Sequence, residues 1–278
     1  MSTTQQLQGV AAPFDAVADR YDETFSSSTI GRAQRGAVWR QLEKTFRSGD
    51  HILEIGCGTG VDACFLAERG VTVLACDSSP QMIDAAARRV RQNGLQALVK
   101  TRVLRGEDIS TLPPDDLFDG AFSNFGALNC VDDVERVAHS LARVLKPGAT
   151  AVLCWMGPRC VWEMIWYLAH ADKDKAFRRF KPEGVNARIA DGAFIQVHYP
   201  SVRFLARRFA PEFRLKGARG IGVVVPPSYV EPWAGRHPRL LQVCEQVDSW
   251  LGGCPGVRLL GDHVLVRLQR EQTAVSGV

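Results

Sequence analysis

The sequence predicts an α/β protein with a doubly wound, Rossmann-like sheet of mostly parallel strands. Between residues 50 and 155, short β-branched or apolar runs alternate with segments whose apolar residues recur at helical spacing. The connections between these runs are short, and a Gly-rich turn follows the first of them. Strands that alternate with helices in this way form a parallel sheet, because right-handed crossovers place the helices on both of its faces.

Composition and charge exclude several classes of protein. The 278 residues include 46% hydrophobic and 23% charged residues, with a net charge of +4, so the chain is neither disordered nor fibrous. A chain of this length hides about 75% of its unfolded surface and needs no disulfide or metal. We find no apolar run long enough to span a membrane. Residues 1–10 are polar and the eight cysteines include no CxxC pair, so we expect reduced thiols in a cytoplasmic protein without a secretory signal.

The first half of the predicted core consists of two strand–helix units. Residues 51–55 form a short apolar strand, and the helix that follows the Gly-rich turn ends at Gly70. Residues 71–76 are β-branched and apolar, which is typical of a buried strand. The next helix begins at Ser79-Pro80, because proline is tolerated at the first helical position, and it ends at Asn93-Gly94.

The second half of the core completes five strands. Residues 100–104 are a weaker strand and residues 118–123 a fourth. A helix over residues 131–145 has one apolar stripe and ends at Lys146-Pro147-Gly148. Residues 149–155 form the fifth strand.

The flanking regions show weaker patterns. We expect helices over residues 160–180, 201–209 and 237–251, and strands over residues 194–199, 213–225 and 262–268. Residues 14–25 and a helix over residues 30–46 are expected to pack across the edge or top of the sheet. No linker divides the chain, so residues 1–278 are expected to form one domain with a large insertion.

The Gly-rich turn Gly56-Cys57-Gly58-Thr59-Gly60 lies where a strand passes into a helix. Glycines there let a small ligand reach backbone amides at the helix N-terminus, since side chains would block the approach. Asp77 ends the next strand, where a carboxylate can accept hydrogen bonds from both hydroxyls of a ribose. The alternatives are a simple tight turn and, for Asp77, an N-cap of the following helix.

The spacing of the turn disfavours phosphate ligands. The dinucleotide fingerprint needs a small residue at the position of Val61, and the Gly-Lys-Ser/Thr of a Walker motif is absent. An adenosine without phosphate fits better. A nicotinamide-dependent dehydrogenase is therefore a more distant alternative.

Five ordered motifs resemble those of class I S-adenosylmethionine-dependent methyltransferases. They are Leu53-Glu54-Ile55-Gly56-Cys57-Gly58-Thr59-Gly60, Asp77-Ser78-Ser79-Pro80-Gln81-Met82, Gly106-Glu107-Asp108-Ile109, Phe118-Asp119 with Ser123-Asn124-Phe125-Gly126, and Leu141-Ala142-Arg143-Val144-Leu145-Lys146-Pro147-Gly148. The resemblance covers residues 14–155 well. It implies a seven-stranded sheet in the order 3-2-1-4-5-7-6, with the last strand antiparallel between the fifth and sixth, and helical lid insertions. N-terminal cap helices would occupy residues 1–49, the cofactor-binding core residues 50–155, and the substrate cover with the last strands residues 156–278.

The resemblance also implies S-adenosylmethionine as cofactor, S-adenosylhomocysteine as product, and no metal. Glu54 would orient the amino group of the cofactor, and Asp77 would bind its ribose. The complete set of implied cofactor-binding residues is Tyr21, Glu54, Gly56, Cys57, Gly58, Asp77, Ser78, Met82, Glu107, Asp108, Ile109, Asn124 and Phe125. Packing is the alternative for Met82 and Phe125, and a loop turn is the alternative for Asp108.

Methyl transfer needs few catalytic groups, because positioning of nucleophile and methyl in line and exclusion of water lower most of the barrier. A base is required only when the nucleophile carries a proton of high pKa. The catalytic candidates are His198, Asn129 and Tyr21, the last of which resembles a tyrosine that closes the pocket in relatives. The alternatives are a surface or core histidine, an N-cap asparagine and an amphipathic tyrosine at a helix end.

The expected substrate is a small molecule, with anionic or aromatic compounds favoured. Residues 173–219 contain twelve Lys/Arg and four Asp/Glu, a net +8 that leaves −4 for the rest of the chain. Such a basic cover can steer an anion. The sequence lacks the Pro-Pro-aromatic motif of base-amine methylation, so a nucleic acid partner is not expected, and the lack of a long apolar run argues against a membrane partner. An RNA methyltransferase and a non-catalytic S-adenosylmethionine-binding regulator remain the alternatives.

Overall fold

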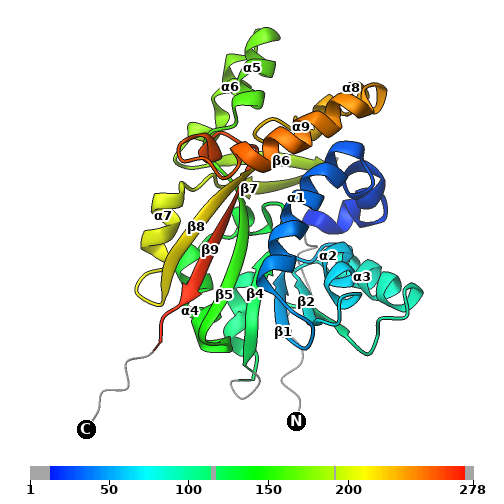
Figure 1. The fold of residues 1–278 in the computed structure, drawn as a ribbon, viewed down its shortest axis with the longest axis vertical. Helices are drawn as coiled ribbons and strands as arrows, with labels where there is room; N and C mark the ends of the chain where they lie inside the picture. Colours follow the sequence, from blue (N-terminus) through cyan, green and yellow to red (C-terminus); the bar gives the residue numbers. More distant parts are fainter. Residues whose placement is uncertain (1–12, 114–116, 191, 273–278) are drawn as a thin grey trace.

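The computed structural model describes residues 13–113, 117–190 and 192–272, so the polar start at residues 1–10 lies outside the described residues. In these ranges, seven strands form one sheet in the order β3-β2-β1-β4-β5-β9-β8 (Figure 1). The strands are β1 His51–Ile55, β2 Thr72–Asp77, β3 Val99–Val103, β4 Phe118–Ser123, β5 Leu145–Met156, β8 Phe213–Ile221 and β9 His263–Arg270. Strand β9 runs antiparallel to both β5 and β8. The predicted order and the antiparallel last strand are therefore confirmed.

Helices pack on both faces of this sheet, and further helices lie above the ends of its strands in Figure 1. Those on the faces are α1 Thr29–Thr45, α2 Val61–Ala67, α3 Pro80–Gln92, α4 Val134–Val144 and α7 Val202–Arg208. Those above the strands are α5 Val161–Ala169, α6 Lys173–Ala176, α8 Glu231–Arg236 and α9 Pro238–Leu251. Shorter turns of 3-10 or π type are η1 Pro13–Arg20, η2 Asp22–Ser26, η3 Gly106–Thr111, η4 Ala127–Cys130, η5 Arg178–Phe180, η6 Ser228–Val230 and η7 Val257–Leu259. Ser28, Ser79 and Asp133 cap α1, α3 and α4 by accepting a hydrogen bond from a backbone N–H of the first turn.

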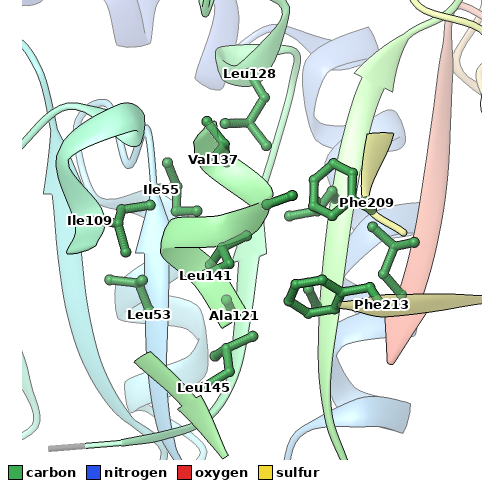
Figure 2. Close-up of a cluster of buried hydrophobic side chains, with 14 of the residues drawn as sticks. Leu53, Ile55, Ile109, Ala121, Leu128, Val137, Leu141, Leu145, Phe209 and Phe213 are labelled. Carbon is green, nitrogen blue, oxygen red and sulfur yellow. The ribbon is translucent and has the colours of Figure 1, made fainter. Parts of the chain in front are cut away.

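Two buried clusters hold the helices against the sheet. On one face, Leu53 and Ile55 of β1 pack with α4, α7 and the adjoining Phe209, as Figure 2 shows. On the other face, Ile52 of β1 packs with Val38 of α1 and with α2 and α3. Side chains of successive strand residues point to opposite faces, so one short apolar strand contributes to both clusters.

The region between β5 and α7 differs from the prediction. Residues 160–180 do not form one helix, because Ala171 has a left-handed φ of 58° and separates α5 from α6. Residues 185–197 form a hairpin of β6 Val185–Ala190 and β7 Ala193–Val197, of which only the second strand was predicted. Residues 161–180 contain no glycine or proline, so the usual sequence signals for the end of a helix are missing at this break.

The N-terminal segment lies against the cover. η1 contacts α3 and also both strands of the β6–β7 hairpin. The eight cysteines all lie within the described residues and are free, which agrees with the expected reduced thiols. None of the described helices combines the length and the hydropathy required to cross a bilayer.

Candidate functional site

The Gly-rich turn joins the end of β1 to α2, and all three of its glycines have positive φ. A Cβ atom at Gly56 would lie 2.2 Å from Cβ of Ala127, and one at Gly60 would lie 2.9 Å from Cβ of Ala86. Packing of η4 and α3 against the turn therefore requires glycine at both positions. A Cβ at Gly58 would make only an ordinary contact, 3.8 Å from Tyr21. Gly58 is thus the glycine that faces the N-terminal segment.

Asp77 connects this turn to α3. Its Oδ2 accepts a hydrogen bond from the backbone N–H of Gly58 and its Oδ1 accepts one from Ser79, each at 2.9 Å. Burial raises the pKa of Asp77, while these N–H groups oppose the shift. Ser79, and not Asp77, supplies the N-cap of α3, so that alternative is wrong. Each carboxylate oxygen keeps a lone pair for a ribose hydroxyl.

Glu54 lies on β1 beneath the turn and is only 1% exposed. Burial, with Asp62 and Asp77 nearby, raises the pKa of this carboxyl well above its usual value. Its Oε2 has no hydrogen-bond partner among the described residues. A buried carboxylate oxygen without a partner is costly, so the ammonium group of a ligand would complete this site.

Tyr21 covers the turn from the N-terminal side. Burial raises the pKa of its hydroxyl to about 12, with Asp77 and other acids adding to the shift and Arg35 opposing it. Its neighbour Asp22 accepts hydrogen bonds from Oγ1 of Thr59 and from Nη2 of Arg89, both at 2.6 Å. The segment that carries Tyr21 is therefore fastened to the turn and to α3.

A buried ionic network that the sequence did not reveal lies beside the turn. Asp62 of α2 accepts hydrogen bonds from Nη1 of Arg35 at 2.7 Å, Nε1 of Trp39 at 2.6 Å and Nδ2 of Asn124 at 2.9 Å. Arg35 and Asp62 are both buried. The available signal was an acid directly after the turn in the apolar run Val61-Asp62-Ala63-Cys64, but its partners lie on other elements.

This network fixes Phe125 after β4. Oδ1 of Asn124 accepts the backbone N–H of Phe125 at 2.9 Å, which supports the left-handed φ of 46° at Phe125. The guanidinium of Arg35 lies 4.7 Å from the centre of the Phe125 ring, and His263 contacts the same ring edge to face at 5.4 Å. Asn124 is thus bonded within the protein at both ends of its amide, and Phe125 is the residue that it positions.

Asn129 is fully buried and uses its amide to join two segments. Its Nδ2 donates to the carbonyl oxygens of Met156, at 2.9 Å, and His198, and its Oδ1 accepts the N–H of Met156 at 2.9 Å. Asp133 caps α4, so the N-cap alternative for Asn129 is wrong. His198 lines a cavity of about 580 Å³ together with Tyr199. Catalytic roles for Tyr21, Asn129 and His198 stay predictions.

The remaining predicted residues are more dispersed. Ile109 is fully buried beside Leu53 and Ile55 in the cluster of Figure 2, and Met82 is in the buried stripe of α3. Asp108 accepts a hydrogen bond from Nη2 of Arg136 at 2.8 Å. Glu107 and Cys57 are buried, whereas Ser78 is exposed. The structure therefore gathers Tyr21, Glu54, Gly58 and Asp77 around the turn most closely.

Part of the basic segment is neutralised inside the protein. Glu163 of α5 accepts hydrogen bonds from Arg178 and Arg179, and Arg179 also bonds to Asp262 at 2.7 Å. Although burial opposes it, Arg178 and Arg179 hold the pKa of Glu163 below its usual value. Burial lowers the pKa of His263, with Asp262 opposing the shift, so this histidine is neutral near pH 7. The net charge of +8 thus overstates the positive surface.

Fold and site together define a Rossmann-like domain in which a buried carboxylate, Asp77, ends the second strand and is bonded to the Gly-rich turn after the first. Residues 52–148 match the family described as methyltransferase domain. This match extends from β1 to the start of β5 and includes the Gly-rich turn and Asp77, so over this range the chain is similar to methyltransferases.

Characterised relatives cover part of the chain. Demethylmenaquinone methyltransferase of Thermobifida fusca is 34% identical over 148 residues, 52% of this chain and 60% of that protein. The 2-phytyl-1,4-naphtoquinone methyltransferase of Synechococcus elongatus is 31% identical over 147 residues, 50% of this chain and 60% of that protein. The chain thus spans about three fifths of the length of these relatives. A solved structure of geranyl diphosphate methyltransferase in complex with SAM covers 85% of both chains with a TM-score of 0.53 at 18% identity, which is a likeness of fold.

Proposed function

We propose that the chain transfers a methyl group from S-adenosylmethionine to a small molecule. The observation that carries this proposal is the pair of buried carboxylates beneath the turn, Asp77 bonded to Gly58 and Glu54 with one oxygen unpartnered. Asp77 would hold the ribose hydroxyls and Glu54 the amino group of the cofactor. The cofactor supplies a methyl group on a cationic sulfur.

The residues of the chain contribute mainly by positioning the reactants and by excluding water. The segment around Tyr21 and Asp22 covers the turn and excludes water from it. Because burial raises the pKa of Tyr21, its hydroxyl is expected to stay protonated near neutral pH and to be available as a hydrogen-bond donor. Phe125, fixed between Arg35 and His263, provides an aromatic wall after β4.

We infer an aromatic small molecule as the methyl acceptor. The names of the two relatives above specify quinone-type ring compounds as their substrates. The cover of this chain contributes Trp166, Tyr229 and Trp233, which pack around Ile30 of α1. Internal pairing of Arg178 and Arg179 with Glu163 reduces the basic surface that an RNA substrate would need.

Two measurements test the proposal. Titration calorimetry should detect S-adenosylhomocysteine binding to the purified chain and no heat with NAD; binding of NAD alone would contradict the cofactor assignment. Transfer of a radiolabelled methyl group should then be measured with 1,4-dihydroxy-2-naphthoate and with bulk tRNA in parallel. Label on tRNA alone would support the RNA methyltransferase alternative. Cofactor binding without product from a broad set of ring compounds would support a regulatory protein.

A further inference from the structure

A cavity of about 580 Å³ opens at the carboxyl ends of β4 and β5, on the face of the sheet that α4 and α7 cover. Its walls come from η4, the start of α4, the end of β5, the segment after β7, and α7. Neither the Gly-rich turn nor Asp77 or Phe125 lines it. We propose that this cavity is a second ligand site, which binds a neutral apolar ring compound that carries an oxygen acceptor.

Trp155 is the central observation. It lies near the end of β5, is 1% exposed, and forms part of the cavity wall. Its indole Nε1 has no hydrogen-bond acceptor among the described residues. Buried indole N–H groups normally find a partner, because an unpaired buried donor is costly. The unpaired donor thus belongs to a residue of the cavity wall, and a ligand oxygen that displaces the side chains around the indole N–H would supply its acceptor.

The other side chains that line the cavity favour a ligand with an apolar ring. Leu128 and Val131 follow β4, Tyr199 follows β7, and Phe204 lies on α7. Ten of the eighteen lining residues are apolar or aromatic, as in many sites for small organic molecules, and the volume lies within the ordinary range of such sites.

The charges around the cavity are balanced. Three acidic and three basic side chains contribute to its lining, namely Asp132, Asp133, Glu135, Arg179, Lys181 and Arg208. Glu135 forms an ion pair with Arg208, and Asp133 caps α4. Arg179 is bonded to Glu163 and Asp262. Since no charge of either sign is in excess, a neutral ligand fits better than an anion or a cation.

The indole signals of the chain provide a direct test. Selective 15N labelling of the six tryptophans, with Trp155 assigned from W155F, is followed during titration with α-tetralone, a neutral two-ring ketone. Tetralin, the same ring system without the carbonyl, is the matched probe. Excess S-adenosylhomocysteine is present throughout to occupy the cofactor cleft. We expect the Trp155 signal to shift with α-tetralone and that of Trp250, 71% exposed on α9, to stay in place.

Two variants separate the hydrogen bond from the apolar cavity. In the wild type, α-tetralone should bind about fivefold more tightly than tetralin, the gain expected from one hydrogen bond. W155F should abolish this preference and leave tetralin binding unchanged, whereas W250F should preserve it. D132W replaces an exposed residue with a side chain that fills the cavity, and it should weaken both probes. An unmoved Trp155 signal, a preference that persists in W155F, or full binding by D132W would each overturn the proposal.

Discussion

The carboxylate of Asp77 accepts the backbone N–H of Gly58 at 2.9 Å, which joins the end of the second strand to the Gly-rich turn after the first. This bond, made within the protein, holds the candidate ribose-binding group beside Gly58 of the turn. A site with this preorganisation loses little entropy when the cofactor binds.

Replacement of Asp77 by alanine should weaken S-adenosylhomocysteine binding by about 1–3 kcal/mol, because two charge-assisted hydrogen bonds to the ribose are lost. Calorimetric titration measures the effect, and thermal unfolding confirms that the variant folds. D84A, at the exposed Asp84 of α3, serves as the matched control. Equal affinity in folded D77A would refute the ribose assignment.

Glu54 should affect stability and cofactor affinity in opposite directions. Its pKa in the folded protein is raised by burial, so the folded chain binds more protons than the unfolded chain between the two pKa values. The free energy of unfolding of the apoprotein should therefore fall as pH rises through this window. E54Q should remove this dependence, stabilise the apoprotein at pH 7, and weaken S-adenosylhomocysteine binding by about 1–3 kcal/mol. Urea unfolding across pH 4–8 measures the slope, and an unchanged slope in E54Q would contradict the role of this carboxyl.

Features of the site that depend on residues close together in the sequence could be predicted, whereas contacts between distant elements could not. Gly58 and Asp77 belong to local patterns in which a strand ends, a turn begins and a carboxylate follows at a fixed place, whereas Glu54 and the strand order followed from the resemblance of these patterns to a known family. The pairing of Arg35 with Asp62 joins two helices, and no local pattern contains it.

The same limit applies to Asn129, whose amide bonds to backbone groups of β5 and of the segment after β7. Every residue has a backbone carbonyl, so the identity of a residue does not indicate that its carbonyl accepts a hydrogen bond. An asparagine after a strand therefore suggested an N-cap or a substrate contact, while its observed partners depend on how the cover folds back on the sheet.

Removal of one partner of the Arg35–Asp62 ion pair should lower the free energy of unfolding more than removal of both charges. Both side chains are buried, so R35M leaves a buried carboxylate without its cationic partner and should destabilise the protein by about 3–5 kcal/mol. Asp62 would retain the donors Trp39 and Asn124. The double variant R35M/D62N should recover part of the loss, because an amide at position 62 is neutral. Chemical denaturation of R35M, D62N and R35M/D62N completes the double-mutant cycle, and strictly additive losses would exclude a direct pair.

The hydrogen bonds that hold the N-terminal segment to the turn should affect the rate of cofactor release more than they affect the stability of the fold. Asp22 is partly exposed and bonds to Thr59 and Arg89, so D22N should leave the unfolding midpoint within about 2 °C of the wild type, as surface changes usually do. It should increase the dissociation rate of S-adenosylhomocysteine several-fold, because the cover over the turn opens more often. Stopped-flow displacement measures that rate. D19N, at the exposed Asp19 of the same segment, is the control.

We expect Asn129 to stabilise the fold. Alanine at this position leaves the N–H of Met156 and the carbonyl oxygens of Met156 and His198 without their buried partner, which should cost about 2–5 kcal/mol of unfolding free energy. N186A, on the exposed face of β6, should change stability by less than about 0.5 kcal/mol. Hydrogen exchange should show faster opening at the N–H of His198, which donates to the carbonyl of Asn129 at 2.8 Å. If N129A instead unfolds like the wild type and loses only methyl transfer, Asn129 acts on substrate, and the hydrogen bonds of its amide contribute little to the stability of the fold.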